Sequence, residues 1–130
     1  MKALIAYYSF TGNNELLARE LQNNLNCDIY RITELKKRHG FSIMFDVLFK
    51  RNPKIKETDI PLSQYEHILL LGPVWAGGIA SPLKTFLKRE KDNIREYSFI
   101  SLCGGGGNKN LAEELTSLAG KKPVSIMEFP

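Results

Sequence analysis

The chain has 130 residues, 43% of them hydrophobic and 25% charged, and its 18 lysines and arginines outnumber its 14 acidic residues to give a formal net charge of +4. These proportions exclude a collagen-like, an intrinsically disordered and a disulfide-rich chain. We therefore expect residues 1–130 to form a single globular domain around one core.

The apolar runs of the chain are short. Ile68–Leu71, one of the longest, is far below the roughly 20 residues that a helix needs to span a bilayer. The N-terminal stretch 1–8 has one basic residue and is too short for the apolar part of a signal peptide. Cys27 and Cys103 match no metal or redox spacing, which fits a reducing compartment. We expect a cytoplasmic protein that does not associate with membranes.

The positive charge is concentrated in one segment. Residues 36–56 contain seven lysines and arginines and one acid, Asp46, so this segment carries +6 and the rest of the chain −2. A nucleic-acid-binding domain usually spreads its basic residues over a whole face. We therefore expect no nucleic-acid partner.

Strand and helix patterns alternate along the chain. Apolar runs predict strands over residues 2–8, 28–32, 67–71, 97–103 and 123–127, and helices are predicted over 15–26, 82–91 and 108–119. In the first helix, Leu17, Leu21 and Leu25 are spaced to form the buried face. Strands that are apolar on both faces and alternate with helices indicate a parallel sheet between two helical layers. The predicted fold is thus a doubly wound, three-layer α/β/α sandwich with a five-stranded parallel sheet.

Three polar or glycine-rich loops follow the first, third and fourth predicted strands, over residues 9–14, 72–78 and 104–108. Ligands of doubly wound folds bind at the carboxyl ends of the strands. We expect these loops to project from one edge of the sheet, and we look for the functional site there.

The first loop places hydroxyl and amide side chains around Gly12, between a strand and a helix. Backbone N–H groups at such a helix start can bind an anion, most simply a phosphate. The alternative is a capped turn that binds nothing. The phosphate-binding sequences of Walker ATPases and of dinucleotide-binding domains are absent, as is the acid pair of a response regulator.

The second loop holds the only tryptophan, Trp75, and the third is a run of four glycines. An exposed tryptophan can stack on a planar ligand, or it can simply pack on the sheet. A glycine run lets a ligand approach the backbone closely, or it is merely a flexible connection. Together the three loops describe a site for a phosphorylated flat heterocycle, and FMN fits best.

Two of these segments resemble a known family. Residues 8–14 resemble the [ST]-x-T-G-x-[TN] phosphate loop of flavodoxins, and residues 72–87 are similar to the first ring loop and following helix of that family. The resemblance implies the sheet order 2-1-3-4-5 and an FMN cofactor. It assigns the phosphate to Ser9, Phe10, Thr11, Gly12, Asn13 and Asn14, the ring to Pro73, Val74, Trp75, Ala76, Gly77 and Gly78, and the pyrimidine edge to Cys103, Gly104, Gly105, Gly106 and Asn108.

The chain departs from the flavodoxin pattern in three ways. It is basic where flavodoxins are usually acidic, its third loop lacks a tyrosine over the second face of the flavin, and it ends at Pro130 directly after the fifth predicted strand. The last departure implies that the usual final helix is missing. One sheet face would then be bare over the third to fifth strands, and we expect a second subunit to cover it in a homodimer.

Three functions follow from these observations. The first is an FMN protein that carries electrons to a partner protein or a small-molecule acceptor, and the second is an NAD(P)H-dependent flavin or quinone reductase on the same site. The third is a flavin-free interaction domain. The long basic connection, residues 33–65, is interpreted either as a solvated crossover with a core of three phenylalanines or as a docking patch for an acidic partner or for NADPH phosphates. No residue is assigned a catalytic role: His39, His67, Ser9 and Ser81 lack partners at catalytic spacing.

Overall fold

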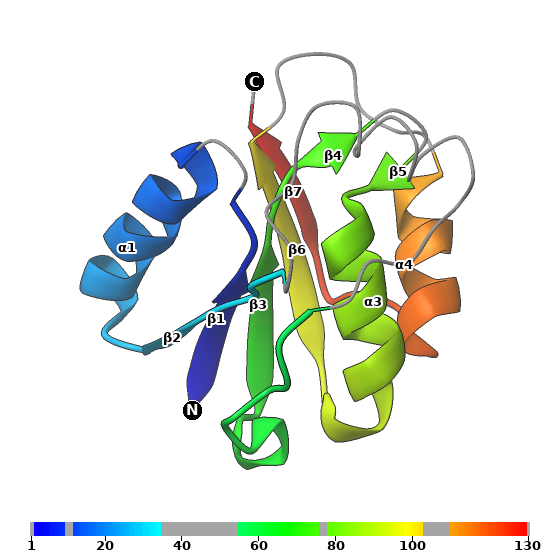
Figure 1. Ribbon diagram of the computed structural model, residues 1–130, viewed down its shortest axis with the longest axis horizontal. Helices are drawn as coiled ribbons and strands as arrows, with labels where there is room; N and C mark the ends of the chain where they lie inside the picture. The colour runs from blue at the N-terminus through cyan, green and yellow to red at the C-terminus, as the bar shows by residue number, and fades with distance from the viewer. Residues whose placement is uncertain (1, 10–11, 35–54, 76–77, 103–109, 130) are drawn as a thin grey trace.

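The computed structural model describes residues 2–9, 12–34, 55–75, 78–102 and 110–129 (Figure 1). The strands are β1 (Ala3–Tyr7), β2 (Asp28–Arg31), β3 (His67–Leu71), β4 (Val74–Trp75), β5 (Gly78–Ile79), β6 (Tyr97–Leu102) and β7 (Ile126–Phe129). The helices are α1 (Asn13–Leu25), α3 (Ser81–Glu90) and α4 (Leu111–Ala119), with short 3₁₀ turns at Leu62–Gln64 and Lys91–Asn93.

Five parallel strands form the central sheet in the order β2-β1-β3-β6-β7. Numbered among themselves, these strands have the order 2-1-3-4-5, so the predicted flavodoxin-like topology is confirmed. In Figure 1, α1 covers one face of the sheet, and α3 and α4 cover the other. The antiparallel ribbon β4-β5 stands apart from this sheet, in a segment that was predicted to be a loop.

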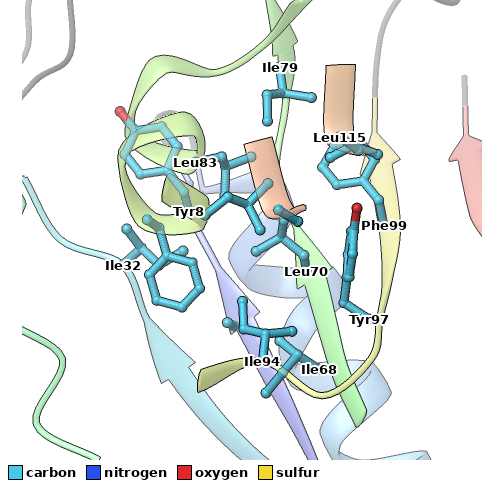
Figure 2. Close-up of a cluster of buried hydrophobic side chains, with 14 of the residues drawn as sticks. Tyr8, Ile32, Ile68, Leu70, Ile79, Leu83, Ile94, Tyr97, Phe99 and Leu115 are labelled. Atoms are coloured by element: carbon cyan, nitrogen blue, oxygen red, sulfur yellow. The ribbon is translucent and has the colours of Figure 1, made fainter. Parts of the chain in front are cut away.

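The larger part of the core lies between the sheet and the helices α3 and α4. Figure 2 shows Leu70 and Phe99 from the sheet in one cluster with Leu83 and Leu115 from the two helices, and all four are fully buried. On the opposite face a smaller cluster packs under α1, around its residue Ala18. Both faces of the sheet are therefore packed against helices.

The face of α1 that packs on the sheet differs from the prediction. Leu17 and Leu21 are partly buried against the sheet, but Leu25 is 55% exposed and Ala18 is fully buried instead. Eight helical residues turn through about 800°, which leaves Leu25 about 80° away from Leu17 around the helix. The spacing i, i+4, i+8 therefore drifts off the buried stripe by its third member.

The sheet face expected to be bare is only partly so. Leu71 and Ile100 are buried in the cluster under α1, so this helix reaches β6. Farther toward the amino ends of the strands, His67 contacts Ser98 (Nε2 to Oγ, 2.9 Å), and Ser98 Oγ also accepts a hydrogen bond from Ser125 Oγ at 3.0 Å. Polar side chains thus lie toward the amino end of the face where apolar ones were expected. A second subunit on this face stays a prediction.

The largest differences from the predicted bounds are at the starts of β7 and α4. The last strand begins at Ile126 and not at residue 123, although Val124 already donates its N–H to the carbonyl of Tyr97 at 2.7 Å. The helix α4 begins at Leu111, and residues 108–109 of the predicted helix are outside the described ranges.

Two tyrosines predict a loss of stability at high pH. Burial raises the pKa of Tyr97 to about 12, and its hydroxyl donates to the carbonyl of Lys121 at 2.9 Å. Burial, together with a hydrogen bond to Asp28, raises the pKa of Tyr65 to about 12. Because both values exceed the ordinary 10.0, the stabilisation is complete below pH 10 and is lost as the pH rises toward 12.

We expect the free energy of unfolding, measured in urea, to fall steadily above about pH 10. The variant Tyr97→Phe keeps the ring and removes the ionisable group, so its stability should depend less steeply on pH in this range. Equal slopes for the two proteins would contradict the raised pKa of Tyr97.

Candidate functional site

Three strands of the sheet end side by side at its carboxyl edge. Tyr7 pairs with Leu71, and Leu71 with Ile100. Just beyond, the N–H of Tyr8 donates to the carbonyl of Leu71 at 2.9 Å, and the N–H of Gly72 to that of Ile100 at 3.2 Å. Figure 1 shows the first turn of α1 and the β4-β5 ribbon at this same end of the sheet. The first two predicted loops therefore leave from one edge, as the sequence indicates.

The first loop ends in a tight turn that starts α1. Ser9 is buried, and its Oγ accepts a hydrogen bond from the N–H of Gly12 at 2.8 Å. Gly12 has φ +97°, a conformation that glycine adopts without strain, and its carbonyl accepts the first helical bond, from Leu16, at 3.1 Å. Of the other predicted phosphate residues, Phe10 and Thr11 are outside the described ranges, as is the side chain of Asn13.

The start of α1 offers backbone donors to an anion. In the described part of the chain, no side chain caps the helix at Gly12, and the first-turn N–H groups of a helix have no partners within it. These groups carry partial positive charge. The one acid of the first turn, Glu15, is paired with Arg31 at 2.9 Å and with Arg19 at 3.9 Å. The turn is therefore suited to a phosphate group.

Two buried polar atoms flank this edge without partners among the residues described. They are Oδ1 of Asn14, a residue only 5% exposed in the first turn of α1, and Oγ of Ser101, near the carboxyl end of β6. Buried polar atoms are nearly always hydrogen-bonded in folded proteins. Their position fits an edge that receives a polar ligand.

The second loop forms the short ribbon β4-β5. Val74 pairs with Ile79, and Trp75 with Gly78. The N–H of Ala80 donates to the carbonyl of Pro73 at 3.1 Å, which closes the base of the ribbon. Pro73 and Val74 are half-buried and Gly78 is buried, whereas the side chain of Trp75 and all of Ala76 and Gly77 are outside the described residues. Stacking by Trp75 therefore stays a prediction.

Glu114, in α4, contacts the ribbon and was not singled out by the sequence analysis. Its Oε1 accepts a hydrogen bond from the N–H of Ile79 at 2.9 Å, and its Oε2 lies 3.5 Å from Nζ of Lys84 in α3. The only signal in the sequence is an acid beside the apolar positions of a helix, and such acids are commonly solvated. The contact joins residues 35 positions apart, which a local pattern cannot indicate.

The remaining predicted residues give less information. Cys103, Gly104, Gly105, Gly106 and Asn108, the predicted pyrimidine edge, are outside the described ranges. His67, which was given no role, lies 3.2 Å from Glu96 at the amino end of β3, remote from the loops. Among the described residues there is no cluster of three metal-ligating side chains and no helix long and apolar enough to cross a membrane.

The basic connection leaves the sheet next to this edge. The hydroxyl of Tyr8, the residue before Ser9, donates to the carboxylate of Glu34, and Glu34 forms an isolated bridge with Ile55. The described residues on either side of the segment 35–54 are thus adjacent. The segment itself is outside the described residues, so its interpretation as a crossover or a docking patch stays open.

Comparison with known proteins gives structural neighbours only. No family model and no curated protein matches the chain. A flavoprotein from Lactobacillus acidophilus NCFM, solved in complex with FMN, matches with TM-score 0.83 and 21% identity over 98% of this chain and 92% of that one. A putative flavoprotein from Bacteroides eggerthii DSM 20697 matches with TM-score 0.80 and 21% identity over 98% and 86%.

A flavodoxin from Fusobacterium nucleatum, bound to flavin mononucleotide, is more distant, with TM-score 0.53 and 14% identity over 97% of this chain and 69% of that one. These likenesses extend over nearly the whole chain and agree with the strand order of the sheet. The chain has the flavodoxin-like fold.

Proposed function

We propose that the chain binds FMN at the carboxyl edge of its sheet and transfers electrons. The observation that carries the proposal is the turn from Ser9 to Gly12, which leads into the uncapped start of α1 at the same end of the sheet as the β4-β5 ribbon. In this proposal the phosphate would bind at the start of α1 and the ring near the ribbon, both at the carboxyl end of the sheet. The structural neighbour that was solved with FMN covers nearly the same length and supports this choice of ligand.

In this proposal the residues of the chain bind and orient the cofactor. Residues 9–14 would hold the phosphate through backbone N–H groups and the Ser9 hydroxyl, residues 73–78 would lie against the ring, and residues 103–108 would line its pyrimidine edge. Bound FMN would supply chemistry in one-electron or two-electron steps. A cytoplasmic location belongs to the same proposal and is supported by the free thiol of Cys27.

The experiment that tests the electron-transfer role is stepwise reduction of the FMN-loaded protein without oxygen, followed by absorbance. An electron carrier predicts two resolved one-electron steps and little steady oxidation of NADPH when a quinone is added. Rapid NADPH oxidation with the quinone would instead establish the reductase. Failure of the protein to retain FMN would favour the third function, a flavin-free interaction domain.

A further inference from the structure

The β4-β5 ribbon is too small to hold its own shape. It consists of two residue pairs, Val74 with Ile79 and Trp75 with Gly78, and isolated two-stranded hairpins are marginal in water even when they are longer. The ribbon also lies outside the main sheet, so the sheet does not fix its orientation. Contacts with neighbouring helices must therefore position it.

The carboxylate of Glu114 makes such a contact. It accepts the N–H of Ile79 at 2.9 Å and is partly buried, with 19% of its side chain exposed. A hydrogen bond to an ionised acceptor is stronger than one between neutral groups. The same carboxylate lies 3.5 Å from Nζ of Lys84, which offsets its charge. The ribbon is thus tied to both α4 and α3.

The ribbon approaches this carboxylate as closely as its backbone allows. A Cβ atom at Gly78 would lie 2.3 Å from Oε2 and 2.7 Å from Oε1 of Glu114. Gly78 has φ +150°, a conformation that favours glycine, and a side chain there would displace the Glu114 carboxylate. The carboxylate therefore lies against the strand that leads out of the predicted ring loop.

We infer that Glu114 is a positioning residue, which holds the β4-β5 ribbon in the orientation that supports FMN binding. The role of the ribbon in binding FMN rests on the proposed function. The contact itself is a property of the chain alone, and so the two can be tested separately.

The contact is tested by hydrogen exchange of the Ile79 amide in the cofactor-free protein. Removal of the acceptor in Glu114→Ala should raise the exchange rate about tenfold or more, since a lost hydrogen bond to a charged group corresponds to about 1.5–3 kcal/mol. Glu114→Gln keeps an uncharged acceptor and should raise the rate by only a few-fold. Glu113→Gln, the matched control on an exposed neighbour in the same helix, should leave it unchanged.

Titration with FMN then tests the role in binding. Glu114→Ala should weaken FMN binding about tenfold, and Glu114→Gln should restore most of the affinity. If the weaker binding of Glu114→Ala came only from a less stable fold, its unfolding midpoint would fall in proportion to the loss of affinity. If Glu114→Ala fails to fold, Glu114→Gln carries the exchange test. Exchange at Ile79 equal to that of the unaltered chain overturns the inference. Failure of the unaltered chain to bind FMN overturns the proposed function and leaves the exchange result standing.

Discussion

Replacing Gly78 by alanine should lower the free energy of unfolding by about 2–4 kcal/mol and weaken FMN binding at least tenfold. The new Cβ would lie 2.3 Å from the Glu114 carboxylate at a φ of +150°. A left-handed or extended positive φ costs about 1–3 kcal/mol for a residue with a side chain, and the new Cβ would also displace the Glu114 carboxylate from its hydrogen bond with the N–H of Ile79. Urea unfolding and FMN titration measure the two effects.

Gly120→Ala is the matched control for this variant. Gly120 ends α4 with φ +76°, and a Cβ there would meet nothing within 4 Å. In this control the free energy of unfolding should fall by only about 1 kcal/mol, the cost of the backbone conformation. The control should bind FMN like the unaltered chain. Equal losses of stability in the two variants would refute the close approach of Glu114 to the ribbon.

The second large effect is expected in the core. Phe99 is fully buried in β6, within the cluster that Figure 2 shows between the sheet and the helices α3 and α4. Phe99→Ala removes its contacts and leaves a cavity, which costs about 3–5 kcal/mol. This is a large part of the roughly 5–15 kcal/mol that stabilises a typical domain.

Met127→Ala provides the comparison, because Met127 belongs to the neighbouring strand β7 but is 48% exposed. Met127→Ala should lower the free energy of unfolding by less than about 1 kcal/mol. Chemical denaturation of both variants decides the point. A loss below about 1 kcal/mol for Phe99→Ala would show that this cluster is not the stabilising core.

Apolar runs with clear ends made most of the sheet predictable. The strand at 67–71 is observed with the predicted bounds, because Ile68–Leu71 are apolar and Gly72 follows them. The last strand was placed three residues early, because Val124 looks apolar in the sequence but is 60% exposed in the structure. Local pattern identifies a strand but does not fix the residue at which it begins.

The candidate site was predictable where its contacts join residues that are close in the sequence. Ser9 and Gly12 are three residues apart, and their turn agrees with the polar strand-to-helix loop that the sequence indicates. The β4-β5 ribbon was missed because four paired residues around glycines resemble a loop. Glu114 was missed because its contact with Ile79 depends on the packing of α4. Such contacts arise only from tertiary structure.

The most direct test of the account is the binding of FMN and of riboflavin to the cofactor-free protein, measured by quenching of flavin fluorescence. The two ligands share the ring and differ in the phosphate, for which the start of α1 is the proposed site. Two hydrogen bonds to a charged phosphate correspond to about 3 kcal/mol or more, so FMN should bind at least about a hundredfold more tightly than riboflavin. Equal binding of the two ligands, or no binding of FMN, would contradict the account.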